Sequence, residues 1–99
     1  EMALTIDATG NPIRVTGTTA ADAEVYAPSN ALAFVREVSV WGFTSQGHKA
    51  VFKDKNGKYI AELVASAANA NETQRVNRAY DSIHCDDLDS GTVLIYLGR

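Results

Sequence analysis

Hydrophobic and polar positions alternate with a period of two along most of the chain, in short blocks separated by Gly, Asn, Asp and Pro. Such alternation is typical of β-strands that bury one face and expose the other. Three blocks of this kind occupy residues 4–8, 13–16 and 23–27. The first two are joined by Thr9-Gly10-Asn11-Pro12 and are predicted to form a hairpin or neighbouring strands, and Pro28 ends the third.

The middle of the chain combines an ambiguous segment with a long predicted strand. Ser29 is a residue type that caps helices, and residues 31–33 favour helix, so a short helix is predicted to begin within Ser29–Arg36. The overlapping run Val35–Phe43 alternates and predicts a strand. Gly42 is expected to mark a bulge or a close approach of the backbone.

The strongest local signal is a β-hairpin, with strands at residues 48–54 and 58–64. Two registers compete for its turn. A two-residue turn at Asn56-Gly57 sets Lys55 opposite Lys58, whereas a type I turn followed by a left-handed glycine pairs Asp54 with Lys58. We favour the second register, because opposite charges replace a repulsive pair and because Asp suits the first turn position.

The last third of the chain carries a loop and two further strands. Residues 65–71 are small and without periodicity, which predicts an exposed loop. Residues 76–83 fit both helical spacing and alternation, and we favour a strand there. Asp89-Ser90-Gly91 then turns the chain into Thr92–Leu97, which is apolar on both faces and is predicted to lie inside a sheet.

These elements together predict an all-β fold, an antiparallel two-sheet β-sandwich or jelly-roll-like arrangement of about eight short strands. The 99 residues, 45% of them apolar, fit one domain spanning residues 1–99. A chain of this length buries roughly 60–70% of its unfolded surface, which leaves little room for a deep pocket. The length therefore weighs against most enzymes.

Charge and cysteine content narrow the function further. Nine Lys and Arg against twelve Asp and Glu give a net charge of −3, which does not supply the positive field of a nucleic-acid binder. The single cysteine, Cys85, excludes a disulfide within the chain. The longest apolar runs have five residues, far below the ~20 needed to cross a bilayer, so no membrane partner is expected.

The N-terminus lacks the basic residues and the long apolar stretch of a secretion signal. We therefore expect synthesis in the cytoplasm. Met2-Ala3 resembles a natural translation start, which would make Glu1 an added residue.

No catalytic, cofactor or metal site is predicted. His84 and Cys85 are adjacent, and neighbouring residues of a strand point to opposite faces, which is poor geometry for a shared metal or a nucleophile pair. His48 has no such companion, and phosphate-binding glycine loops and serine elbows are missing. The acidic cluster Asp86, Asp87 and Asp89 permits calcium but lacks EF-hand spacing, so a solvated turn is favoured.

Two groups of residues are candidates for contacts with a partner or between identical subunits. The basic group is Lys49, Lys53, Lys55 and Lys58 on the predicted hairpin. Lysines on an exposed strand usually discourage edge-to-edge pairing. The alternative is a ring in which this hairpin meets Asp86, Asp87 and Asp89 of the next subunit.

The second group is aromatic: Trp41, Phe43, Tyr26 and Tyr96. Large aromatics in small sandwiches usually fill the core, and the alternative is a platform for a sugar or a protein partner.

Three segments resemble small structural proteins of tailed bacteriophages: residues 35–42, the hairpin at 51–60 and the closing 88–97. In such proteins a hydrophobic strand leads to a D-x-x-G hairpin, and the chain ends in a serine-glycine turn and a strand with a tyrosine. The resemblance covers about the last two-thirds of the chain, and residues 1–30 carry no matching motif.

The resemblance implies a β-sandwich found on virions, and a capsid decoration or cement role where coat subunits meet. It implies the major capsid protein and identical subunits as partners, with a trimer as one candidate assembly of the subunits, and assembly in the host cytoplasm. The alternative is a glycan- or receptor-binding module of a fibre or adhesin that uses Trp41. A buried Trp41 favours the first function, and an exposed Trp41 beside a concave patch favours the second.

Overall fold

The computed structural model describes residues 4–98 and contains nine strands and no helix within that range. The strands are β1 (Leu4–Asp7), β2 (Ile13–Gly17), β3 (Ala23–Tyr26), β4 (Ala33–Trp41), β5 (Lys49–Lys53), β6 (Tyr59–Val64), β7 (Glu72–Tyr80), β8 (Ile83–Leu88) and β9 (Thr92–Leu97). No helix in the described part is long and apolar enough to span a membrane. The expectations about Glu1 and Met2 lie outside the described residues.

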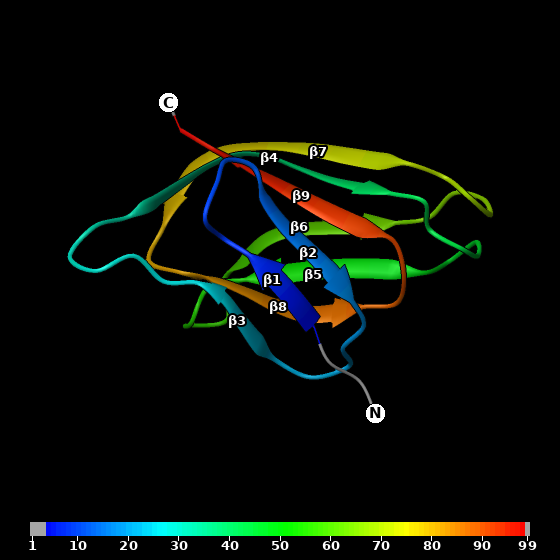
Figure 1. Cartoon of the computed structure of the whole chain (residues 1–99), viewed down its shortest axis with the longest axis horizontal. Coiled ribbons are helices and arrows are strands. Elements are labelled where there is room, and N and C mark those ends of the chain that lie inside the picture. Colours follow the sequence, from blue (N-terminus) through cyan, green and yellow to red (C-terminus); the bar gives the residue numbers. More distant parts are fainter. Residues whose placement is uncertain (1–3, 99) are drawn as a thin grey trace.

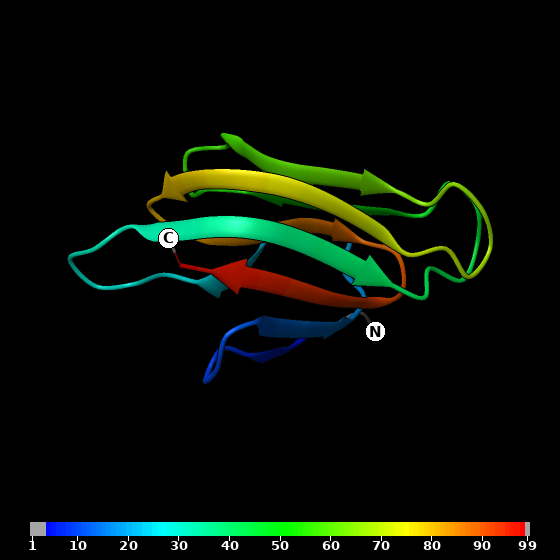
Figure 2. The ribbon, with the colours of Figure 1, turned by 90° about the horizontal axis from the view of Figure 1, so that it is seen from above.

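The strands form two antiparallel sheets (Figure 1). From β2 to β5 and again from β6 to β9, successive strands alternate between the two sheets, as in a jelly roll. One sheet has the order β1-β2-β9-β4-β7 and the other β3-β8-β5-β6. Figure 2 shows β7, β4, β9 and β2 following one another across the five-stranded sheet, with β6 beside β7. The predicted all-β sandwich is therefore confirmed, and β9 lies inside a sheet as expected.

The core lies between the sheets and is made by the inward positions of each strand. Ile13, Val15, Val38, Val40, Val93 and Ile95 from one sheet, and Phe52, Ile83, Cys85 and Leu88 from the other, are fully buried. Because successive strand residues point to opposite faces, the residues between them form the two outer faces. Each fully buried aliphatic or aromatic side chain contributes about 1.5–3 kcal/mol of hydrophobic stabilisation.

Residues 4–30 complete both sheets. β1 pairs with β2 and β2 with β9, while β3 pairs with β8. The predicted hairpin of the first two blocks is therefore confirmed, and no free arm occurs within residues 4–30. The predicted loop at 65–71 and the preference for a strand through residues 76–80 are also confirmed.

The short helix predicted to begin within Ser29–Arg36 is wrong. Asn30 has a left-handed φ of 53°, and β4 already begins at Ala33. Ala33 and Val35 are 4% and 0% exposed, so their alternation places both in the core. This burial outweighs the weak intrinsic preference of alanine and leucine for helix.

Gly42 marks neither a bulge nor a close approach. It follows β4 with φ +75°, and a Cβ there would have no atom within 4 Å. The bulge lies instead at Arg36, where the register with β7 shifts. The close approach occurs at Gly91, whose Cβ would lie 2.9 Å from the carbonyl oxygen of Trp41 and from Val40 Cγ1.

The hairpin turn pairs Asp54 with Lys58, as predicted, but attraction between their charges is not the cause. The Asp54 N–H donates to the carbonyl of Lys58 at 2.9 Å, and Gly57 has φ +84°. Asp54 Oδ1 accepts the N–H groups of Asn56 (2.8 Å) and Lys58 (2.9 Å). The carboxylate therefore stabilises the turn through backbone amides, and the charge of Lys58 is not what holds it.

The expected solvated turn at Asp86 and Asp87 is wrong, because both residues belong to β8, which the sequence pattern did not reveal. Aspartate is disfavoured in strands, so its presence masked the alternation. Ile83, Cys85 and Leu88 are fully buried. Their burial fixes β8 between β3 and β5, and only Asp89 follows the strand.

Candidate contact surfaces

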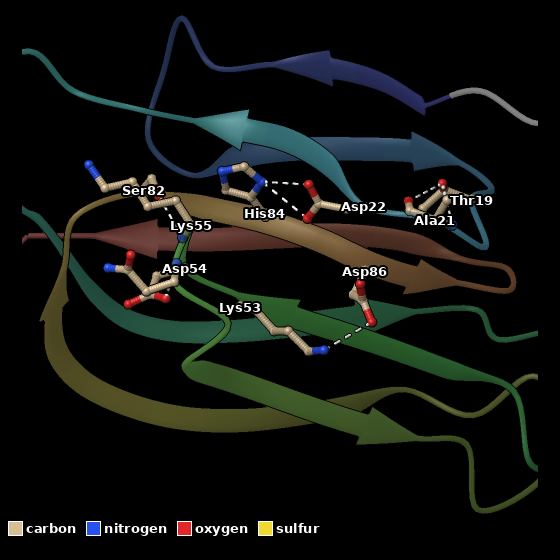
Figure 3. A network of polar contacts seen from close by, with 10 residues as sticks. Thr19, Ala21, Asp22, Lys53, Asp54, Lys55, Ser82, His84 and Asp86 are labelled. Carbon is tan, nitrogen blue, oxygen red and sulfur yellow. Dashed lines mark hydrogen bonds and ion pairs between the residues drawn. The ribbon is translucent and has the colours of Figure 1, made fainter.

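The outer face of the four-stranded sheet carries charged side chains from β5 and β8 (Figure 3). Lys53 Nζ lies 3.2 Å from Asp86 Oδ2 and 4.8 Å from the centre of the Tyr59 ring. The hydrogen bond to Asp86 is the largest cause that raises the pKa of Lys53 above its usual value. Lys53 therefore keeps its positive charge, and Asp86 of the same chain balances that charge.

A second contact on this face joins the same two regions. The Lys49 N–H donates to Asp89 Oδ2 at 2.9 Å, and the Asp89 N–H donates to the Lys49 carbonyl at 3.0 Å. Partial burial raises the pKa of Asp87, and the neighbouring Asp89 raises it further. The lysine hairpin and the aspartate segment thus meet within one chain at Lys53 and at the Lys49 backbone, since β5 pairs with β8; a contact between subunits of a ring stays a prediction.

Lys55 and Lys58 lie apart from these aspartates, at the hairpin turn. The Lys55 N–H donates to Ser82 Oγ at 3.0 Å. Lys58 lines an open cleft of about 350 Å³ with Leu32, Asp54, Asn56, Ala79, Tyr80 and Asp81. The cleft was not predicted, because it forms where three segments distant in sequence meet at one end of the sandwich.

His84 and Cys85 point to opposite faces of β8, as their adjacency predicts. His84 Nδ1 lies 3.1 Å from both carboxylate oxygens of Asp22, a partner that the sequence did not indicate (Figure 3). Cys85 is fully buried, and this burial raises the pKa of its thiol to about 12. Within residues 4–98, no three His, Cys, Asp or Glu side chains gather as ligands for a metal ion.

The outer face of the five-stranded sheet has an apolar centre. Leu94 lies opposite Ser39 and Arg14, Tyr96 opposite Glu37, and Trp41 opposite Thr92. Trp41 is 56% exposed, while Leu94 and Tyr96 are half-buried. We call Trp41, Leu94 and Tyr96 the aromatic face.

The other two aromatic candidates do not belong to the aromatic face. Phe43 is 0% exposed and fills the core, so it is not available for a contact with a partner. Tyr26 lies on β3, in the other sheet, and packs partly against the core. Trp41 is exposed, but it lines neither the cleft at Lys58 nor a smaller one formed by Arg36, Glu37, Arg75 and Asn77. The exposed Trp41 that favours glycan binding is therefore present, but without the concave patch beside it.

Comparisons with known proteins identify no family. No protein-family model matches the chain, and no curated protein matches it. Among solved structures, the chain is similar to an RmlC-like cupin protein from Desulfovibrio desulfuricans, with 12% identity and a TM-score of 0.38. That similarity covers 99% of this chain and 82% of the other, and a likeness at this level assigns neither a family nor an activity.

Proposed function

We propose that the chain is a non-enzymatic structural protein of a tailed-phage virion, a capsid decoration or cement protein. In this role it binds the major capsid protein and identical subunits and stabilises the shell. The observation that carries the proposal is the uncovered outer face of the five-stranded sheet, with the aromatic face at its centre.

The aromatic face has the composition of a protein contact surface. Tryptophan and tyrosine are enriched where proteins bind one another, and polar residues commonly surround such a centre. Here polar residues lie opposite each member of the aromatic face in the neighbouring strand. Arg14 pairs with Leu94, Glu37 pairs with Tyr96, and Thr92 pairs with Trp41. Since Trp41, Leu94 and Tyr96 line neither the cleft at Lys58 nor the smaller one at Arg36, this face suits the surface of another protein better than it suits a small molecule, which binds in concave sites.

The framework behind this face is suited to a repeated adhesive role. Strands from both halves of the chain hold the face, since β9 lies between β2 and β4. A protein that binds only the assembled shell stabilises it by mass action, and many copies multiply a modest affinity. The resemblance of residues 35–42, 51–60 and 88–97 to virion proteins supports the same role.

The proposal is tested by adding the purified chain back to particles produced without it and measuring the bound copies by co-sedimentation. Trp41→Ser is expected to weaken binding by about 30-fold, the effect of losing about 2 kcal/mol at a central contact. Tyr59→Ser is the matched control, because Tyr59 is also 56% exposed but lies on the other sheet. It is expected to change binding less than about twofold.

Two results would overturn the proposal. The first is that the unaltered chain does not bind the particles. The second is that Trp41→Ser and Tyr59→Ser weaken binding equally, which would mean that the aromatic face has no special role. Circular dichroism of both variants checks that each remains folded.

The exposure of Trp41 also favours a second candidate, a glycan-binding module of a fibre or adhesin. Exposed indole rings stack on sugars, and Thr92 beside Trp41 offers a hydroxyl group for hydrogen bonding. Tryptophan fluorescence during titration with host-surface oligosaccharides tests this function. Since Trp41 is the only tryptophan of the sequence, a saturable change in its fluorescence would support glycan binding over the cement role.

A further inference from the structure

The β4–β7 pair contains a bulge that gathers charged side chains on an edge strand. Val35 pairs with Arg78 and Glu37 with Arg75, so two residues of β7 lie opposite the single residue Arg36. One of the two is Asn77, whose φ of 50° is left-handed. A bulge breaks the usual alternation, and here Arg36 and Glu37, consecutive in sequence, line the same cleft.

The cleft at this bulge is small and polar. It measures about 70 Å³ and is lined by Arg36, Glu37, Arg75 and Asn77. That volume is about twice the share of one liquid water molecule, which suits one small polar group. We call it the bulge cleft.

Neither arginine of the bulge cleft has an ion partner in residues 4–98. The ion pairs in that range join Lys53 to Asp86 and His84 to Asp22. Glu37, the nearest carboxylate in sequence, has Oε2 3.5 Å from Ser39 Oγ, and Ser39 in turn bonds Thr73 at 3.0 Å. The bulge cleft therefore holds two guanidinium groups and one carboxylate, a formal charge of +1.

We propose that the bulge cleft binds one carboxylate group, presented by an acidic side chain of a protein partner. The planar guanidinium binds a carboxylate through paired N–H groups, and the Asn77 amide adds a further donor. A single negative charge balances the +1 of the lining residues, whereas a phosphate dianion exceeds it.

The position on β7 indicates how the partner approaches. β7 is the last strand of the five-stranded sheet and β6 of the other sheet lies beside it, so a partner reaches the bulge cleft from the outer face (Figure 2). The bulge disfavours regular addition of another strand, so the contact depends on side chains. This inference is independent of the proposed role on a virion, since its test uses the isolated chain.

The test is an NMR titration that follows the backbone amides of Arg36 and Asn77 and the arginine side-chain Nε groups. The probe is a capped Gly-Glu-Gly peptide, and its neutral match is capped Gly-Gln-Gly. Acetate and inorganic phosphate form the free-anion arms. We expect saturable shifts in the millimolar range with the glutamate peptide, weaker binding of acetate and phosphate, and no shift with the glutamine peptide.

Three variants make the assignment specific. Arg75→Gln is expected to weaken peptide binding about fivefold, the effect of about 1 kcal/mol. Glu37→Gln removes the competing resident carboxylate and is expected to tighten binding about twofold or more. Arg14→Gln, on the same outer face beside Asp7, is the control and is expected to leave binding unchanged.

Several results would overturn the inference. They are unsaturable shifts, an equal loss with Arg14→Gln, no loss with Arg75→Gln, or weaker binding with Glu37→Gln. Phosphate or acetate binding as tightly as the peptide would exclude a protein partner as the source. If Arg75→Gln does not fold, Asn77→Gly replaces it, because glycine keeps the left-handed backbone and removes only the amide.

Discussion

At Gly91 the backbone tolerates no side chain, for two independent reasons. Its φ of +89° is left-handed, and a Cβ would lie 2.9 Å from the Trp41 carbonyl oxygen and from Val40 Cγ1. The sequence placed a turn here correctly. It did not reveal the close approach, because the contact joins the start of β9 to the end of β4.

Gly91→Ala is therefore expected to lower the free energy of unfolding by about 2–4 kcal/mol, from the unfavourable φ and the steric overlap together. Gly10→Ala is the control, since a Cβ there meets nothing within 4 Å and its φ is not in the left-handed region. It is expected to stay within about 0.5 kcal/mol of the original chain. Urea unfolding followed by circular dichroism measures both, and equal effects would contradict the geometry.

The buried thiol of Cys85 is expected to make the folded chain less stable as the pH rises above about 9. Burial raises the pKa of the folded thiol to about 12 from a usual value of 9.0. An acid whose folded pKa is raised contributes stability below its unfolded pKa and loses it as pH rises toward the folded pKa.

Between pH 9 and 10 the chain is therefore expected to lose about 1 kcal/mol through this thiol. Cys85→Ala removes that part of the pH dependence, whatever its effect at neutral pH. Urea unfolding at pH 8, 9 and 10 gives the comparison. Identical slopes for the two proteins would show that the buried thiol titrates normally.

At the scale of single elements, local patterns predicted every strand except β8, whose residue types are unusual for a strand. The hairpin at residues 48–64 was predictable, because Asp54 and Gly57 fit one turn geometry. β8 was not, because Asp86 and Asp87 hide an alternation that burial alone enforces. The helix predicted near Ser29 failed for the same reason, since propensity is weaker than core packing.

The candidate contacts were predictable only as residue types. The sequence singled out Lys53 and Asp86 as opposite charges, but their pairing within one chain requires that β5 and β8 be neighbours. Similarly, Trp41 and Phe43 look alike in sequence and differ completely in exposure. The bulge cleft depends on a register shift, for which no local pattern gives a signal.

The pairing of Lys53 with Asp86 predicts how β5 and β8 respond to charge reversal. Lys53→Glu is expected to lower the urea midpoint at low salt, and the double reversal with Asp86→Lys is expected to restore it. The difference is expected to shrink in 1 M salt, because counterions screen exposed charges. Lys55→Glu is the control, since Lys55 has no ion pair among residues 4–98, and an equal effect there would contradict the intrachain pair.

For the whole molecule, the two outer faces carry different chemistry. The lysines of the described chain lie on the β5–β6 hairpin, whereas its arginines lie on β2, β4 and β7 of the five-stranded sheet. The ion pair with Asp86 of β8 balances the charge of Lys53 on the lysine side. The arginines and the aromatic face remain available, so the five-stranded sheet is the side on which we expect partners to bind.

The proposed role makes the protein an abundant structural component of a virion. Quantitative mass spectrometry of purified particles, with the major capsid protein as the internal reference, tests it most directly. We predict hundreds of copies per particle, in a fixed ratio to the capsid protein. A dozen or fewer copies would contradict a decoration role, and a complete absence from the particles would contradict the virion assignment itself.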